Sequence, residues 1–415
     1  MPARFEWGVA IVALFVLGRW PVLFFRLRLV ALLGPVRLPD WQYDIYVRIV
    51  FAAVEVAVAA VAVRRVRPGS LRRLPFLLMF CAFAWASTIW SIEPGVTIWR
   101  SLMLIGAAAA GWYIGERFSL QQIAMIVASV AAVGTVASYL ALAIVPHLAT
   151  MTGNQHAWSG VYYNRNELGL VLSGGILTSG FLLTRTPGRA RIAELVAICA
   201  EAFLLAKSGN RTGPMALGGA LLACLIVFAV RRYAKSKLVV FWASVLSLGT
   251  ILIGFGAIEW QWKRIVAFVG RNITLSSRSF LWRVDRAFIG MKPWGGWGFE
   301  SFWSNTLMQK YVVYILKHFP YDAHNGYYEV GLGLGWIGVA LLAGFLGITL
   351  YRAFTHAWRG RDIISLWPLA FLLFILAANF TESLFVSSEA FWVVTVAVAF
   401  ALSRTTTSLI RRPKI

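Results

Sequence analysis

The distribution of apolar residues along the chain constrains the fold more than any other feature. A helix needs about 18 to 25 apolar residues to cross a hydrocarbon core of roughly 30 Å. Windows of this kind lie near 7–33, 43–63, 74–90, 96–115, 122–145, 166–183, 192–206, 213–230, 238–258, 327–350, 365–385 and 388–403. Of the 415 residues, 59% are hydrophobic and only 13% are charged. The sequence therefore predicts an all-α polytopic membrane protein with about 12 transmembrane helices.

Basic residues gather in short segments between these windows. The five richest are "RRVRPGSLRR" from Arg64, "TRTPGRAR" from Thr184, "RRYAKSK" from Arg231, "YRAFTHAWRGR" from Tyr351 and the C-terminal "RRPKI". All five fall on one side of the predicted topology, and loops rich in Lys and Arg stay in the cytoplasm. We expect a multi-pass membrane protein with these loops and both termini on the cytoplasmic side. The formal charge of +22 then reflects topology, not binding of nucleic acid.

One long hydrophilic stretch, about 259–326, lies on the opposite, extracytoplasmic side. It divides the chain into an N-terminal bundle of about nine spans (1–258), a large outer loop (259–326), and C-terminal helices with a basic tail (327–415). No sequence repeat and no low-complexity tract appears, so we expect one membrane domain. No small-residue cleavage site follows the first window, which favours a retained signal anchor.

The cysteines and the familiar catalytic motifs narrow the chemistry. Cys81, Cys199 and Cys224 lie in apolar windows without metal-ligand spacing, so we interpret them as small buried hydrophobic residues. No Walker motif opens a predicted helix, no HExxH motif lies on a predicted span, and no GxSxG motif appears between a strand and a helix. No adjacent pair of acids clearly invites a divalent metal, although Asp285, Asp322 and Glu329 keep a metal site open as an alternative. An arginine-based mechanism without metal or cofactor is the simpler reading.

Three arginines lie at or near the predicted outer ends of spans, against the topological bias. They are Arg165 in "YYNRNELG", Arg211 in "KSGNRTG" and Arg278 in "LSSRSFLWR", each beside Asn, Ser, Thr or Gly. A charge at membrane depth costs roughly 2.5 to 3.5 kcal/mol, so a compensating partner is expected. Guanidinium forks match phosphate oxygens and stay charged, and three of them can clamp a diphosphate. The alternative is that each arginine caps a helix or reaches the lipid headgroups.

His324 and Asn325 directly precede an apolar window. A histidine with an ordinary pKa of about 6.5 is neutral at physiological pH and can accept a proton from a sugar hydroxyl, which is the role of a general base. The alternative is a structural histidine that hydrogen-bonds backbone groups at a helix start. For Asn325 we consider two roles, orienting His324 or capping the following helix, and favour the cap.

Aromatic side chains cluster in "WRVDRAFIGMKPWGGWGFESFW". The flat faces of Trp282, Trp294, Trp297 and Trp303 suit stacking on sugar rings, and tryptophan is also typical of membrane interfaces. Both interpretations stay open. The "GGWGFE" run is not a phosphate loop, because the strand and helix that would frame one are missing.

Together these segments resemble the O-antigen ligase and polymerase family. "DAHNGYYEVGLGLGWIG", from Asp322, is similar to its signature, in which Ala-His-Asn precedes a helix with a Glu and a Gly-x-x-Gly. Further matches follow family order: "WASTIWSIEP", "YYNRNELG", "KSGNRTG", and "SSRSFLWR" with "PWGGWGFESFW". Together they span most of the chain. Gly333 departs from the pattern, since members often carry a second acidic residue there.

The resemblance implies a membrane glycosyltransferase of GT-C-like architecture with an outward-facing chamber. Its donor would be a glycan linked to a polyprenyl diphosphate, transferred with inversion and without metal. Arg211 and Arg278 would bind the diphosphate and His324 would act as general base. Arg165 and Asn166 are weaker candidates, and Asn325 and Glu329 would support the site.

The acceptor is left open by the sequence. Another lipid-linked repeat would make the protein a polysaccharide polymerase, which the "GWGFESFW" block slightly favours, whereas lipid A core would make it an O-antigen ligase; transfer to protein is a third choice. From other classes, a transporter of lipid-linked glycan or a non-catalytic scaffold remains possible. A transporter would be expected to show two related halves and ionisable residues at mid-membrane, and neither is evident.

Overall fold

The computed structural model describes residues 4–17, 40–151, 157–233, 275–316, 322–387 and 389–410. Within these ranges the chain is helical, and its strand-like pairing consists of one isolated bridge between Thr150 and Trp158. The main helices are α1 (Arg4–Leu17), α3 (Asp40–Arg65), α4 (Pro75–Ala86), α5 (Pro94–Arg117), α6 (Leu120–Ile144), α8 (Arg165–Leu183), α9 (Gly188–Ser208), α10 (Thr212–Tyr233), α12 (Leu275–Met291), α13 (Thr306–Leu316), α14 (Gly326–Arg359), α15 (Trp367–Ala378) and α17 (Glu389–Ile410). Short helical pieces are η1 (Pro68–Arg73), η2 (Ser87–Trp90), α7 (Pro146–Ala149), η3 (Phe302–Ser304), η4 (Ile363–Leu366) and α16 (Leu384–Ser387).

Four of these helices are long and apolar enough to cross a membrane: α6, α8, α10 and α14. Shorter apolar helical stretches lie at Phe5–Leu14, Ala52–Ala62, Pro75–Trp90, Ile363–Ala378 and Ala390–Thr405. The prediction of an all-helical membrane protein is confirmed at this level. The count of about 12 spans and the GT-C-like architecture stay predictions, since the window 238–258 and much of 7–33 lie outside the described residues.

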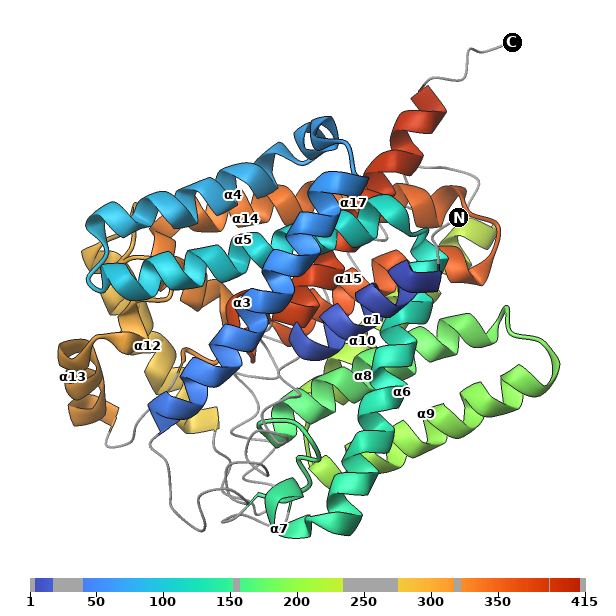
Figure 1. Cartoon of the computed structure of the whole chain (residues 1–415), viewed down its shortest axis with the longest axis horizontal. Helices are drawn as coiled ribbons and strands as arrows, with labels where there is room; N and C mark the ends of the chain where they lie inside the picture. Colours follow the sequence, from blue (N-terminus) through green and yellow to red (C-terminus); the bar gives the residue numbers. More distant parts are fainter. Residues whose placement is uncertain are drawn as a thin grey trace.

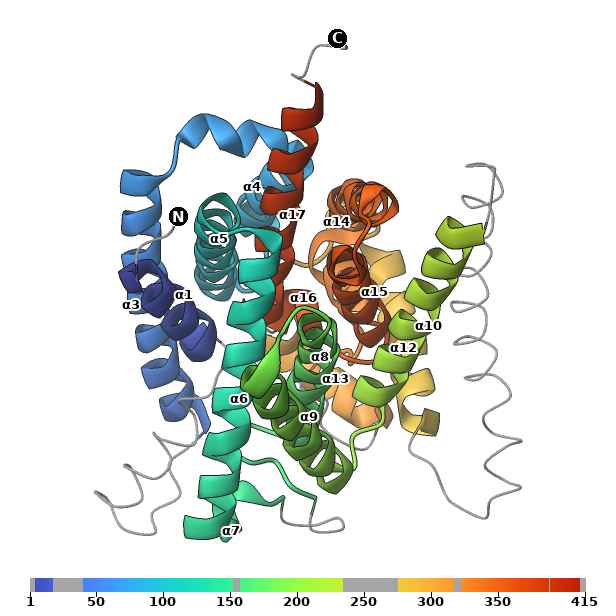
Figure 2. The same ribbon diagram turned by 90° about the vertical axis from the view of Figure 1, so that its right-hand side faces the viewer.

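Helix α17 forms the centre of the bundle. It packs between α5 on one side and α14 and α15 on the other (Figure 2). Nearly every side chain from Trp392 to Leu402 is buried, as expected for a helix that is apolar on all sides. In α5, Gly111 and Gly115 stand one turn apart against α17, where a Cβ would come within 2.7 Å of Val393 O and 2.5 Å of Ala397 O, respectively. Small residues at this spacing allow two membrane helices to approach closely.

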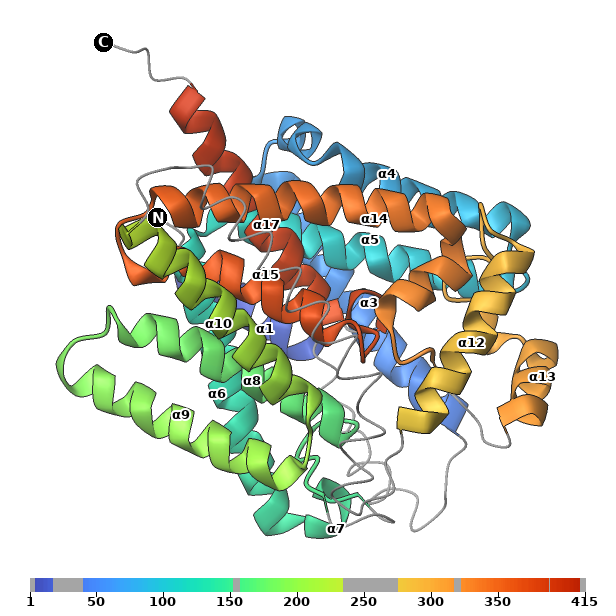
Figure 3. The same cartoon turned by 180° about the vertical axis from the view of Figure 1, so that it is seen from behind.

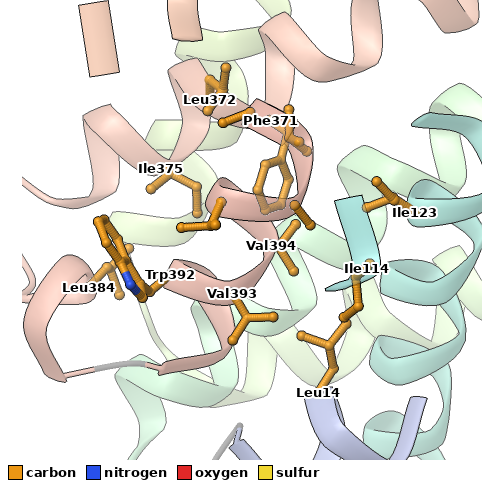
Figure 4. Close-up of a cluster of buried hydrophobic side chains, with 14 of the residues drawn as sticks. Leu14, Ile114, Ile123, Phe371, Leu372, Ile375, Leu384, Trp392, Val393 and Val394 are labelled. Atoms are coloured by element: carbon orange, nitrogen blue, oxygen red, sulfur yellow. The ribbon is translucent and has the colours of Figure 1, made fainter. Parts of the chain in front are cut away.

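The larger of two hydrophobic clusters contains residues from most of the described chain, from Ala10 to Leu402. Figure 4 shows side chains from the N-terminal and C-terminal parts of the sequence in one cluster, among them Leu14, Ile114, Phe371 and Val393. The core therefore includes residues on both sides of the predicted boundary at 259–326, and the division into three regions stays a prediction.

Of the three free cysteines, Cys81 and Cys224 are buried as predicted, but Cys199 is exposed on α9. The expectation for Cys199 was wrong because apolarity of a membrane helix does not say which face meets lipid.

The bundle has two chemically different ends. Helices α4, α5 and α14 run side by side along its long axis (Figure 1). At one end basic side chains meet: Arg73 pairs with Glu116 at 2.8 Å, Arg352 donates to Arg73 O at 3.3 Å, and Arg185 pairs with Asp362. At the other end α14 begins, and α12 packs beside its N-terminal part (Figure 3). The described parts of the basic segments thus share one end, opposite His324.

Candidate functional site

The segment before α14 is held in an unusual backbone conformation. His324 has a φ of 47°, in the left-handed region that few residues other than glycine adopt. The next residue, Asn325, caps α14: its side-chain oxygen accepts from the backbone N–H groups of Tyr327 at 3.0 Å and Tyr328 at 3.2 Å. The backbone N–H of Gly326 donates to the carbonyls of Asn379 and Glu382. Of the two roles considered for Asn325, the structure shows the helix cap.

The side chain of His324 faces Asp322. Its Nδ1 lies 2.9 Å from Oδ1 of Asp322, and the same oxygen accepts the backbone N–H of His324 at 2.8 Å. The ring N–H is poorly aligned with that oxygen, so we describe this contact as a close electrostatic approach. The His324 side chain is 37% exposed. A carboxylate thus lies close to Nδ1 while part of the ring remains accessible, an arrangement compatible with proton transfer at Nε2.

These contacts shift the pKa of both groups. Burial lowers the pKa of His324, but attraction to Asp322, with a contribution from Glu382, outweighs burial and the repulsion of Arg278, so the pKa is raised. Burial raises the pKa of Asp322, but contact with His324 and attraction to Arg278 outweigh it, so the pKa is lowered. Asp322 is therefore an ionised partner for the imidazole.

One face of α12 lies against this segment. Arg278, Trp282 and Asp285 follow each other at spacings of four and three residues, which places them on one side of a helix. The guanidinium of Arg278 donates to Thr381 O at 2.7 Å and pairs with Glu382 at 3.3 Å. Trp282 Nε1 donates to Ala323 O at 2.8 Å. Helix α12 thus fixes the backbone immediately before His324.

Two further acids lie behind the His324 and Asp322 pair. Glu329, in the first turn of α14, is buried and accepts the backbone N–H of Ala323. Asp285 is 0% exposed, and neither of its oxygens has a hydrogen-bond partner among the described residues. Burial, then repulsion by Asp322, raises the pKa of Asp285 to about 8, with Arg286 opposing. Asp285 is thus mainly a neutral acid near pH 7. Within the described ranges no three His, Cys, Asp or Glu side chains are arranged to hold a metal ion.

Arg165, Asn166 and Arg211 come together at the starts of α8 and α10. Asn166 Oδ1 accepts from Asn210 Nδ2 at 3.1 Å, which joins the two turns. Arg165 Nη1 lies 4.0 Å from the position of a Cβ at Gly209, the left-handed residue that ends α9. Arg211 is exposed and has no side-chain partner among the described residues. The turns that carry Arg165 and Arg211 are thus joined, whereas convergence of Arg165, Arg211 and Arg278 on one anion stays a prediction.

The two groups of arginines are connected through one turn. Thr381 Oγ1 donates to Thr212 Oγ1 at 3.0 Å, and Thr212 directly follows Arg211. The carbonyl of the same Thr381 accepts from Arg278. The turn after α15 therefore links the Arg211 region with Arg278 and, through Glu382, with the start of α14. No contact between the Arg211 and Arg278 guanidinium groups is observed in the described residues.

The aromatic cluster is mostly part of a second core. Trp297 and Trp303 pack with Phe288 and Phe302, and Trp282 is buried beside Tyr328. Trp294 is the exception, at 70% exposed. Trp294 is therefore accessible for stacking on a sugar or for contact with a membrane interface. The other three tryptophans pack against protein side chains, a role that neither interpretation of the sequence included.

The glycine-rich loop explains the departure at Gly333. Gly298 N–H donates to Gly333 O at 2.9 Å, and a Cβ at Gly333 would lie 3.2 Å from Gly298 O. Gly335 interrupts α14 with φ 62° and ψ −164°. A larger side chain at position 333 would press on the loop, so a second acid is disfavoured here by packing.

Sequence reasoning missed Glu382 and Asn379, and it did not pair Asp322 with His324. Asn379 is 0% exposed, and its Oδ1 accepts from the backbone N–H of Leu384 at 2.8 Å. A signal was present, because "NFTES" places an amide and an acid within the apolar window 365–385, where polar residues are costly.

The fold and the site define a class: a polytopic helical membrane protein with a histidine, acid and arginine site at one end of its bundle. Residues 195–343, which include Arg211, Arg278 and His324, match the family model described as O-Antigen ligase. Over 328 residues the chain is 22% identical to the exopolysaccharide production protein ExoQ of Rhizobium meliloti (strain 1021), covering 74% of this chain and 72% of that protein. These matches confirm the resemblance to the O-antigen ligase and polymerase family, and they support ligase- or polymerase-type activity.

Proposed function

We propose that this protein is a glycosyltransferase of the bacterial inner membrane. It moves a glycan from polyprenyl diphosphate onto a sugar hydroxyl outside the cytoplasm. The observation that carries the proposal is the pairing of His324 with Asp322 on a rigid segment beside Arg278. A base, an orienting acid and a phosphate-binding group together match this reaction class.

In this reaction neutral His324 takes the proton from the acceptor hydroxyl as its oxygen attacks the anomeric carbon. Asp322 orients the ring and stabilises the imidazolium that forms. A new carbon–oxygen bond forms while the bond to the diphosphate breaks, and the electron pair leaves with the diphosphate. Attack from the side opposite the leaving group inverts the anomeric centre. A general base of this kind contributes roughly 10²- to 10⁴-fold in rate.

The arginines stabilise the negative charge that develops on the diphosphate leaving group. Arg211 is exposed, with no described side-chain partner, and Arg165 lies close to the same turn. Arg278 uses only part of its donor set on Thr381 and Glu382, so other N–H groups remain for phosphate oxygens. Loss of one donor aimed at developing charge typically costs about 10²- to 10³-fold in kcat.

We favour a second lipid-linked repeat as acceptor, which would make the protein a polysaccharide polymerase. The name of its relative, an exopolysaccharide production protein, supports this choice. The alternative is transfer to lipid A core, and the description of the matching family model favours that reading.

Purified protein incubated with polyprenyl-diphosphate-linked glycan tests the proposal. With a second lipid-linked repeat as acceptor we expect a ladder of products on a gel, and with lipid A core no shifted band. A single shifted band with lipid A core alone would mean a ligase. His324→Ala and Arg211→Ala should each lose product, while Arg189→Ala, at the basic end, serves as control. Wild-type rates in His324→Ala would reject the general base, and donor binding without product in wild-type protein would favour transport or scaffolding.

A further inference from the structure

A pocket of about 390 Å³ opens at the basic end of the bundle, away from the His324 site. Its lining residues come from the end of α3, the short helix η1 and the last turn of α5. Its lining residues are Arg65, Val66, Arg67, Gly69, Ser70, Arg73, Glu116 and Arg117. Four arginines line this one cavity. Because like charges repel each other, negative groups are needed nearby to balance them.

Protein carboxylates balance two of the four arginines. Arg73 Nη2 contacts both oxygens of Glu116 at 2.8 Å. Arg117 makes two hydrogen bonds to Glu6, from Nε at 2.8 Å and from Nη2 at 3.0 Å. Among the described residues that line the pocket or pair with its arginines, four positive charges stand against two negative ones, a net charge of +2.

The excess charge belongs to Arg65 and Arg67. Both are exposed, and neither has a side-chain partner among the described residues. Ser70, which lines the pocket, is held in place by a hydrogen bond, since Trp112 Nε1 donates to Ser70 Oγ at 2.7 Å. At Gly69 a Cβ would meet nothing within 4 Å, so the cavity is open on that side. The pocket is therefore a built, partly fixed cavity with two free guanidinium groups at its rim.

The helices beside the pocket carry exposed apolar residues. On α3, Val56 is 68% exposed and Ile49 is 57% exposed, and on α4, Met79 is 45% exposed. From Ile49 to Arg65 a helix rises about 24 Å. Arg65 thus lies where an apolar helix surface gives way to basic residues, the depth at which phosphates of lipid headgroups occur.

We propose that this pocket binds the phosphate of an anionic ligand, with a lipid headgroup as its source. Arg65 and Arg67 contact the phosphate oxygens, and the ion-paired Arg73 and Arg117 form the wall behind them. Guanidinium is suited to this because its fork of donors matches phosphate geometry. The site is far from His324, so it does not rest on the proposed glycosyl transfer.

Native mass spectrometry of the full chain in neutral detergent tests the proposal. The protein is titrated with dioleoyl phosphatidylglycerol, with phosphatidylcholine as the lipid without net charge. Arg65→Ala/Arg67→Ala should weaken binding of phosphatidylglycerol by roughly 10- to 30-fold, since each basic residue near an anionic lipid contributes about a factor of 5. The control is Arg189→Ala/Arg191→Ala, which removes two exposed arginines at the same end but outside the pocket. We expect it to change binding less than about twofold.

The outcomes separate the sources and can overturn the site. If millimolar inorganic pyrophosphate displaces the lipid from wild-type protein, the pocket takes soluble phosphates as well; if it does not, the lipid is the ligand. Equal losses in the two double variants would reject the pocket, because they would show a general effect of charge. Equal binding of phosphatidylcholine and phosphatidylglycerol by wild-type protein would reject it too.

Discussion

At the scale of residues, the backbone at His324 is held in a conformation that costs free energy. A left-handed conformation outside glycine costs on the order of 1 to 3 kcal/mol. Here the cost is offset by fixed partners: Asp322 accepts the His324 backbone N–H, and Gly326 donates to two carbonyls of the turn after α15. Asn325 then caps α14. The backbone on both sides of His324 is therefore held by specific hydrogen bonds.

The His324 and Asp322 pair predicts a pH dependence. Asp322 raises the pKa of His324, so in the proposed reaction the imidazole stays protonated, and unable to accept a proton, up to a higher pH than an ordinary histidine with a pKa of about 6.5. Asp322→Asn removes that attraction, so the pKa falls. The acidic limb of kcat/KM against pH should therefore move to lower pH, while the plateau rate drops less than in His324→Ala.

The full pH profile of both variants is the measurement that checks this. A limb that stays in place, or that moves to higher pH, would show that Asp322 does not set the pKa of His324. Asp362→Asn is a suitable control, because Asp362 pairs with Arg185 at the opposite end of the bundle. Its profile should match that of the wild type.

At the scale of elements, the interruption of α14 shapes the site. Trp336 N–H donates to Pro293 O at 2.7 Å and Trp297 N–H donates to Leu332 O at 2.8 Å. The loop after α12 therefore hydrogen-bonds backbone groups of α14 on both sides of the interruption. The first two and a half turns of α14 can thus take a direction of their own. This places the segment that carries His324 against α12.

Gly335→Ala should destabilise the protein. The residue has φ 62°, and a Cβ would lie 2.5 Å from Pro293 O and from Trp294. Backbone strain and overpacking together predict a loss of about 2 to 4 kcal/mol. The matched control is Gly347→Ala in the same helix, where a Cβ meets nothing within 4 Å and stability should be unchanged or slightly higher. Thermal unfolding in detergent measures both, and equal melting temperatures would contradict the argument.

At the scale of the whole molecule, the two ends of the bundle predict an orientation. The basic end should face the cytoplasm and the His324 end the exterior. Single cysteines at the exposed positions Lys310 and Arg189, introduced after replacement of Cys81, Cys199 and Cys224, report this directly. A membrane-impermeant maleimide should label Lys310→Cys in intact bacterial cells, and Arg189→Cys only after permeabilisation. Labelling of both from outside would refute the orientation.

Many residues of the candidate site could be singled out from the sequence because their types are rare in apolar segments. Arg165, Arg211 and Arg278 stand out against the cost of burying charge, and the motif around His324 is local in sequence. Asp322 and Asp285 were visible as acids, but their roles depend on where α12 lies. Glu382 could not be paired with Arg278 from sequence, since 104 residues separate them.

The sequence by itself determined that the chain is helical, that it belongs in a membrane, and which residues are chemically unusual. Apolar length and residue type decide these properties locally. Only the tertiary structure decided which partners meet: Glu382 with Arg278, Thr212 with Thr381, and the loop from Pro293 to Gly298 with the break in α14. It also decided that Trp297 and Trp303 pack against a second hydrophobic cluster and that Cys199 is exposed. Such pairings depend on how helices pack, and packing is set by shape across the whole bundle.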